Sequence, residues 1–216
     1  EVAALVVRNT PALLPRIESS RLRDELGVPS GVALVLYQGL LLPERGLVPL
    51  VAAMEHVPDA VLVVQGSGPE ESAMRQAAEQ AGLGDRVRFM GWVAPEDAHE
   101  YASSADIGVV IYEATTLNNR LAGPNKLFVY LMAGLPVAAR DFPGPREVVV
   151  GERVGDVFAD ATAEAIASTL NRMLADRTEL CRTAERARAV AESTYNWDRE
   201  KQVLVDLYRR LSGNGV

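Results

Sequence analysis

The sequence has little of the chemistry that metal sites and disulfides require. Its 216 residues include one cysteine, Cys181, and two histidines, His56 and His99. A single cysteine forms no internal disulfide and belongs to no multi-cysteine metal site. Neither histidine has a cysteine or carboxylate at the spacing of a ligand pair. We therefore expect no metal ion, a buried or half-buried Cys181 within a helix, and histidines that are structural or exposed.

Lysine is almost absent, and the charge balance is acidic. Lys126 and Lys201 are the only lysines among 22 basic residues, and the formal net charge is −7. A protein that binds the phosphate backbone of nucleic acid needs a basic face. The charge balance therefore argues against a nucleic-acid partner.

Long apolar runs are also missing. Hydrophobic residues make up 48% of the chain, enough for a sizeable core, yet no run approaches the roughly 20 residues that cross a bilayer. The chain opens on Glu1 and shows no signal peptide. We expect a cytoplasmic protein, and we expect this chain to be a piece of a longer polypeptide.

What is present is a regular alternation of apolar strands with helical segments. Runs such as "VALVLYQG" and "AVLVVQG" are apolar throughout, which is typical of strands buried on both faces of a sheet. Strands are expected at 32–39, 60–66, 86–91, 106–112, 135–140 and 154–159, with helices between them and after the last. This alternation predicts an α/β fold, a Rossmann-like parallel sheet with helices on both faces.

The first 27 residues differ from the rest. An apolar run at 2–7, the two prolines of "RNTPALLPR" and a short helix closed by Gly27 are typical of a linker. We interpret 1–27 as a linker from a preceding domain and 28–216 as one α/β domain.

In such a sheet the ligand lies beyond the carboxyl ends of the strands. In loop 38–46, Gly39 lets the backbone approach a ligand, and Arg45 and Gly46 open the next helix. Arg45 either faces an anion or pairs with Glu44. Both interpretations remain open from the sequence.

The stretch "GPNKLFVYLM" predicts a helix that begins at Pro124 and Asn125, with Lys126 in its first turn. A helix N-terminus carries unpaired N–H groups and a partial positive charge, which suit a phosphate. The alternative is an ordinary core helix.

Two further loops carry candidate residues. In "GWVAP", the ring of Trp92 and the backbone of Val93 could receive a flat base, although a tryptophan half-buried at a strand end is equally compatible. The long polar loop 112–125 offers Asn118 to a sugar. The loop "GSGPEE" has Glu71 where a dinucleotide fingerprint needs glycine, and no P-loop occurs, so nicotinamide and flavin cofactors are not expected.

Six segments in this order resemble a known module. They are "YQG…PERG", "VVQGSGPE", "DRVRFMGWV", "SSADIGVVIY", "GPNKLFVYLMAGLPVAARDFPGPREVV" and "YNWDREKQVLVDLY". Together, over about 28–212, they resemble the C-terminal, nucleotide-sugar-binding domain of the GT-B-fold glycosyltransferases of the retaining group 1 family.

The resemblance implies roles for the candidate residues. It places Gly39 and Arg45 beside the donor diphosphate, with backbone N–H groups at Pro124–Lys126 on the same diphosphate. It places the backbone of Trp92 and Val93 against the base. The last helix would cross back to a preceding domain.

Three positions depart from the family pattern. Leu121 and Val129 stand where the family often carries two glutamates, one toward the donor sugar and one on the ribose, and Leu40 replaces a basic residue. A valine accepts no hydrogen bond from a ribose hydroxyl.

The resemblance implies a glycosyltransferase fragment whose substrate is a nucleoside diphosphate sugar and which uses no cofactor. The acceptor, a glycan or small molecule, would be held by an N-terminal domain, and a peripheral association of the full protein with a membrane stays open. The alternative is a catalytically degenerate GT-B-like scaffold or activating subunit. A GT-B-fold sugar-nucleotide epimerase is the third interpretation, which the absence of a second catalytic carboxylate or a histidine cluster disfavours.

Overall fold

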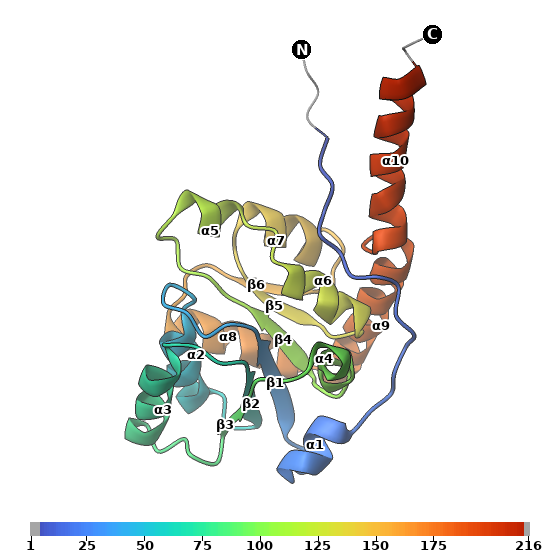
Figure 1. Cartoon of the computed structure of the whole chain (residues 1–216). Helices are drawn as coiled ribbons and strands as arrows, with labels where there is room; N and C mark the ends of the chain where they lie inside the picture. Colours follow the sequence, from blue (N-terminus) through green and yellow to red (C-terminus); the bar gives the residue numbers. More distant parts are fainter. Residues whose placement is uncertain (1–4, 214–216) are drawn as a thin grey trace.

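The six strands of the sheet are all parallel, in the order β3-β2-β1-β4-β5-β6 (Figure 1). This computed structural model describes residues 5–213. The strands are β1 (Ala33–Gln38), β2 (Ala60–Gln65), β3 (Val87–Gly91), β4 (Ile107–Val110), β5 (Val137–Arg140) and β6 (Gly155–Phe158). All six expected strands are therefore confirmed, as is the Rossmann-like parallel sheet.

Helices connect the strands and follow the last one. They are α1 (Arg21–Leu26), α2 (Leu47–Ala53), the 3-10 turn η1 (Met54–His56), α3 (Glu71–Gln80), α4 (Pro95–Ser103), α5 (Leu117–Leu121), α6 (Asn125–Met132), α7 (Pro143–Val149), α8 (Ala163–Leu174), α9 (Arg177–Ser193) and α10 (Trp197–Gly213). No helix among residues 5–213 is both long and apolar enough to cross a membrane.

The chain reverses its direction across the sheet between β1 and β4. It builds outward from β1 to β3, then crosses through α4 and returns to place β4 on the other side of β1, with Val35 opposite Ile107. At such a reversal the flanking loops diverge and leave a crevice at the carboxyl ends of the strands. The crevice of this sheet therefore lies beyond Gln38 and Val110.

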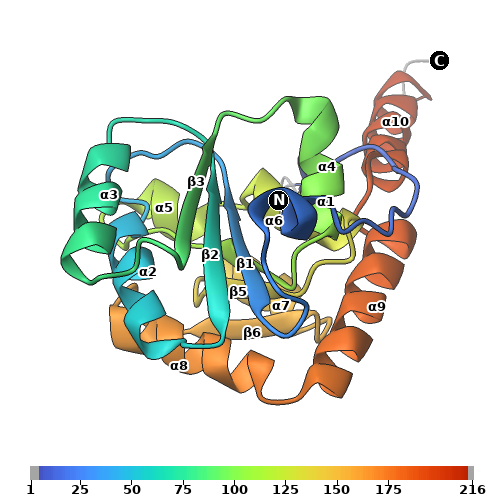
Figure 2. The ribbon, with the colours of Figure 1, turned by 90° about the horizontal axis from the view of Figure 1, so that it is seen from below.

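Helices cover both faces of the sheet (Figure 2). Side chains of α2, α3 and α8 pack on one face, and those of α1, α4, α6, α7 and α9 on the other. Along β1 the side chains alternate between the two cores: Val35 and Tyr37 belong to the first, Leu34 and Leu36 to the second. Helices packed on both faces of the sheet remove the apolar area of the strands from water, which explains why the strands are apolar throughout.

The N-terminal segment packs on the domain. Residues 5–20 form no regular secondary structure, yet the N–H of Trp197 donates to the carbonyl of Pro11 at 2.8 Å, and Arg188 donates to the carbonyl of Leu14 at 2.6 Å. Leu22 of α1 is fully buried in the same core as the strands. Residues 11–22 of the expected linker therefore pack against the α/β domain, and the division at residue 27 stays a prediction. Residues 1–4 of the expected linker lie outside the described residues.

Three smaller expectations need correction or refinement. The stretch 112–125 is not a continuous loop, because Thr116 caps the short helix α5 by accepting from the N–H of Asn119. Cys181 of α9 is exposed rather than buried. His99 is buried and its Nε2 lies 3.1 Å from the carbonyl oxygen of Pro15, so it has the structural environment expected for one of the histidines.

Candidate functional site

A cleft of about 340 Å³ opens at the carboxyl ends of β1 and β2, beside the start of α6. Five of the donor-binding candidates named from the sequence lie in its wall: Gly39, Trp92, Val93, Lys126 and Val129. The rest of the wall is formed by Gln38, Leu40, Gln65, Gly66, Ser67 and Ala98. The structure thus brings residues from separate parts of the chain to the crevice that the topology creates.

Lys126 is held by aromatic rings rather than by a carboxylate. Its Nζ lies 3.8 Å from the centre of the Tyr37 ring and 5.9 Å from the centre of the Tyr112 ring. Such cation–π contacts attract the ammonium without neutralising its charge. Burial, together with the neighbouring charge of Arg45, lowers the pKa of Lys126 to about 7.

Arg45 stands beside the ring of Tyr112 as well. Its Cζ lies 4.3 Å from the centre of that ring. Among residues 5–213, neither Arg45 nor Lys126 forms an ion pair with a carboxylate, whereas most other arginines of the chain do. The pairing of Arg45 with Glu44, left open from the sequence, is not formed. Two basic side chains that lack a carboxylate partner within this range therefore contact the ring of Tyr112.

Gly39 makes room for the ammonium of Lys126. Its φ is +138°, and a Cβ built on it would lie 3.1 Å from Nζ of Lys126. Any side chain at position 39 would therefore crowd the ammonium in a backbone conformation that favours glycine. Gly66 lies directly against the backbone of Gly39, because a Cβ at position 66 would lie 1.8 Å from the carbonyl oxygen of Gly39.

A buried tyrosine fixes α6 relative to β1. The N–H of Gln38 donates to the hydroxyl of Tyr130 at 2.9 Å, and the Tyr130 ring packs against Gly108 of β4, where a Cβ would come within 2.5 Å of it. Tyr130 lies one turn after Lys126, on the buried face of α6. The hydrogen bond therefore sets the distance between the Lys126 turn and the last residue of β1.

The far end of the cleft is apolar and more open. Trp92 follows β3 and is 71% exposed, Leu40 is 65% exposed, and Val129 is half-buried on the face of α6 that borders the cleft. Val93 packs on the second core. A flat, partly apolar ligand has contact area here, next to the two cations.

Arg45 and the remaining donor-binding candidates named from the sequence lie outside the wall of the cleft. Gly46 is buried with φ +63° and packs against Ile111, Pro124 is the buried cap position of α6, and Asn125 is exposed at its first position. Asn118 is exposed on α5. Its neighbour Asn119 is buried and bonds Thr115, which makes α5 a structural element as well as a candidate sugar contact.

Sequence reasoning missed the tyrosines. Tyr37, Tyr112 and Tyr130 surround the Lys126 turn, and burial raises the pKa of each, so all three hydroxyls stay neutral. The signal was present, because Tyr37 is the one aromatic residue of β1 and Tyr112 comes two residues after the end of β4. Gln65 was also missed. It accepts from the side chain of Gln38 at 2.8 Å and closes the floor of the cleft.

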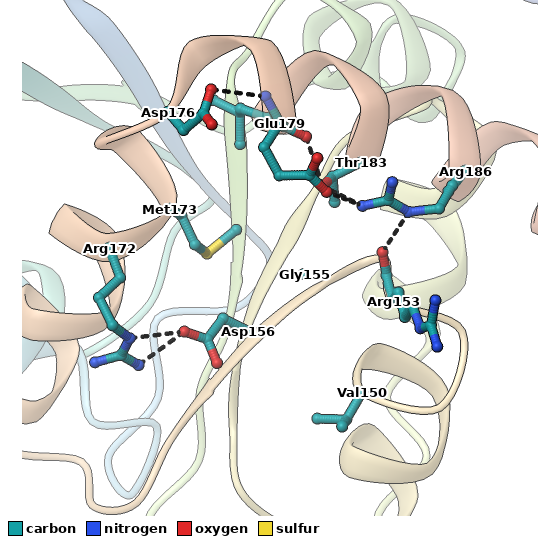
Figure 3. A pocket seen from close by; sticks show the side chains of 11 residues that line it. Val150, Arg153, Gly155, Asp156, Arg172, Met173, Asp176, Glu179, Thr183 and Arg186 are labelled. Atoms are coloured by element: carbon teal, nitrogen blue, oxygen red, sulfur yellow. Dashed lines mark hydrogen bonds and ion pairs between the residues drawn. The ribbon is translucent and has the colours of Figure 1, made fainter.

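A larger cavity of about 530 Å³ lies elsewhere, at the amino end of β6 (Figure 3). Its charged groups largely satisfy one another: Arg172 donates to Asp156 at 2.7 Å, and Arg186 donates to Glu179 at 2.7 Å (Figure 3). It lies at the opposite end of the strands from the crevice. The smaller cleft, with Lys126 in its wall and Arg45 on the adjoining Tyr112 ring, is therefore the candidate site.

The family model described as "Glycosyl transferases group 1" matches residues 18–190. The lipopolysaccharide core biosynthesis glycosyltransferase LpsD of Rhizobium meliloti is 26% identical over 194 residues, which cover 90% of this chain and 53% of LpsD. The chain therefore spans about half the length of this relative.

Two solved structures have the same fold. Sucrose-phosphate synthase from Thermosynechococcus elongatus matches with a TM-score of 0.83 and 26% identity, over 97% of this chain and 53% of the other. The Anabaena protein HepE, solved in complex with UDP, matches with a TM-score of 0.76 and 22% identity, over 90% of this chain and 52% of the other.

Proposed function

The chain belongs to the group 1 glycosyl transferase family, and we propose that it binds the nucleoside diphosphate sugar of a transferase that acts with retention of configuration. The sugar would pass to an acceptor hydroxyl, the acceptor being a glycan or a small molecule. Because the chain spans about half of LpsD, we assign the acceptor site to a second domain of the full enzyme.

One observation carries this proposal. Arg45 and Lys126 meet at the ring of Tyr112 without a carboxylate partner, at the mouth of α6. Two neighbouring cations repel each other, and an anion that contacts both would relieve this repulsion. A diphosphate supplies that charge and also accepts hydrogen bonds from the first N–H groups of α6.

The rest of the cleft suits the nucleoside. Trp92 and the backbone of Val93 border its open end and would receive the base, while Val129 would lie beside the ribose. The sugar would then point toward α5 and Asn118. The UDP complex of HepE makes a uridine nucleotide the first ligand to test.

The charges would act on the departing diphosphate. Negative charge develops on it as the bond to the sugar breaks, and fixed cations in a site shielded from water stabilise that charge. Arg45, Lys126 and the positive end of the α6 dipole would replace a metal ion in this role. Residues 5–213 contain no group of three or more histidine, cysteine or acidic side chains placed to hold a metal.

A second candidate function rests on Val129 and Leu40. Both lie in the wall of the cleft, and the side chain of neither can form a hydrogen bond with a nucleotide. A member of the family that lost donor binding would keep the fold as a scaffold or an activating subunit.

Calorimetric titration with UDP, GDP, ADP and dTDP separates the two. The donor-binding proposal expects one of them to bind with a dissociation constant in the micromolar to millimolar range. Each tenfold change in that constant corresponds to about 1.4 kcal/mol of binding free energy. The same nucleosides without phosphates serve as the control. Failure of all four diphosphates to bind would favour the scaffold.

A further inference from the structure

The ammonium of Lys126 has an unusual set of neighbours. The centre of the Tyr37 ring, on β1, lies 3.8 Å from it, and the centre of the ring of Tyr112, two residues after β4, lies 5.9 Å from it. The guanidinium of Arg45, from the turn before α2, lies over the same Tyr112 ring, and its charge acts on the amine. The other titratable group of α6 is Tyr130, whose hydroxyl accepts a hydrogen bond from the N–H of Gln38. Within residues 5–213, no carboxylate bonds to Lys126.

Neither tyrosine can serve as the missing anion. The hydroxyl of Tyr37 donates to the carbonyl of Leu40 at 3.1 Å, and Tyr37 is fully buried. Burial raises the pKa of both Tyr37 and Tyr112, so both remain neutral near neutral pH. The rings therefore hold the ammonium by cation–π attraction alone.

Two forces in the empty cleft disfavour the charge on Lys126. Its surroundings are poor in water, and Arg45 shares the Tyr112 ring with it. Both effects lower the pKa of the amine, to about 7, so that above this pH the amine is largely neutral. A bound diphosphate reverses the balance, since an adjacent anion favours the charged amine.

We propose that Tyr37 and Tyr112 are positioning residues that hold Lys126 as a proton acceptor, and that a nucleoside diphosphate binds this cleft together with one proton taken up from solvent. The proton adds to the neutral amine at Nζ, and no covalent bond of the nucleotide changes. The inference deepens the proposed function and rests on it, because it needs a diphosphate in the cleft.

Calorimetry of UDP binding in Tris and in HEPES measures the proton directly, because the two buffers differ in their enthalpy of ionisation. At about pH 8 we expect an uptake approaching one proton for each UDP bound. From about pH 7.5 to about pH 9 the affinity should fall by about five- to tenfold for each pH unit. If UDP does not bind, GDP, ADP and dTDP are used in that order.

Lys126→Arg is the first matched variant. An arginine keeps the charge at every pH of the experiment. We expect it to bind UDP with no proton uptake and with less than a twofold change in affinity across the same pH range. If the variant fails to fold, the wild-type proton count alone decides the question.

Tyr112→Leu and Tyr112→Phe test the positioning role, since Tyr112 is only half-buried. The phenylalanine keeps the ring and should keep the uptake. The leucine lets water reach the amine, which restores the charge in the empty cleft, so the uptake at about pH 8 should fall to less than half of the wild-type value. Weaker binding with unchanged uptake would show that the ring is merely structural.

The possible failures are distinguishable. UDP binding without proton uptake, or equal uptake by the wild type and Lys126→Arg, would overturn the inference and leave the proposed function standing. Absence of binding by all four diphosphates at about pH 7, where Lys126 is about half charged, would overturn both.

Discussion

Lys126 illustrates how a functional residue departs from what folding favours. A lysine amine surrounded by tyrosine rings and next to an arginine costs stability, because burial and repulsion both act against its charge. The chain has one other lysine, Lys201, which lies exposed on α10 and pairs with Asp198. The contrast favours the proposal that Lys126 serves a bound diphosphate rather than the fold.

Replacing Lys126 by methionine should stabilise the empty protein, and the effect should depend on pH. The pKa of this lysine is about 7 in the folded state, against 10.5 for an unperturbed lysine, so the folded state binds fewer protons between these values and wild-type stability rises with pH there. The gain from Lys126→Met should therefore be largest near pH 7 and shrink toward about pH 10. Thermal unfolding of both proteins at the two pH values checks this, with Lys201→Met as control. A gain independent of pH would contradict the account.

Val129→Glu tests the position of Val129 in the cleft. Val129 lies one turn after Lys126 and is half-buried in the cleft wall. A carboxylate there would accept from the ribose hydroxyls and should tighten UDP binding on the order of tenfold, or about 1.4 kcal/mol. Val129→Gln is the matched uncharged variant and should gain less. A lower melting temperature without any gain in affinity would mean that Val129 belongs to the core.

At the scale of elements, the sequence predicts the fold better than the site. Every strand and each of the larger helices follows from apolar runs and breakers, because a strand buried on both faces leaves a signal in its own residues. Lys126, Gly39 and Arg45 could be named as candidates, since a helix start and a glycine after a strand are local features, and they stay predictions. The packing of Tyr37 and Tyr112 around Lys126 could not, because these residues come from separate parts of the chain and only the order of the strands brings them together.

The helix α5 was missed for a different reason. The stretch from 112 to 125 is polar and contains no apolar period, so its sequence is typical of a loop. Two local hydrogen bonds of Asn119 stabilise the helix instead. Its side-chain amide donates to the hydroxyl of Thr115, and its backbone N–H donates to the hydroxyl of Thr116. A polar side chain buried within five helical residues leaves no hydrophobic pattern to detect.

Tyr130→Phe tests the link between α6 and β1. The change removes the hydroxyl that accepts from the N–H of Gln38 and leaves a buried donor unpaired, which costs about 1–3 kcal/mol. Urea unfolding should show this loss with an unchanged slope. The control is Tyr208→Phe, a residue that lies exposed on α10. Equal stability of Tyr130→Phe and the wild type would show that the bond does not hold α6.

At the scale of the molecule, large apolar side chains are exposed on two segments. They are Val205, Tyr208 and Leu211 along α10 and Leu5 and Val6 in the N-terminal segment, and both segments extend from the domain in the same direction in Figure 1. The cleft also opens outward from the carboxyl edge of the sheet. Both features agree with the proposal that the acceptor is held by a second domain.

The 216-residue chain alone should therefore transfer no sugar. It is expected to bind a nucleotide but to lack the groups that hold an acceptor and close the cleft. Incubation with UDP-glucose, UDP-N-acetylglucosamine and GDP-mannose, with sugar acceptors present, should yield no glycoside by mass spectrometry. Any glycoside formed at a rate proportional to the chain concentration would show that the acceptor site lies within these residues.

The central claim is that Arg45 and Lys126 jointly bind a diphosphate, and calorimetry of four variants tests it most directly. Arg45→Ala and Lys126→Ala should each weaken binding of UDP, or of the diphosphate that binds best, by about 1.5–3 kcal/mol, the range for hydrogen bonds to charged groups. Arg209→Ala and Lys201→Ala, on exposed positions of α10, should change nothing, and uridine binding should be the same in all four. An equal loss of UDP and uridine affinity in the cleft variants, or no loss at all, would contradict the claim.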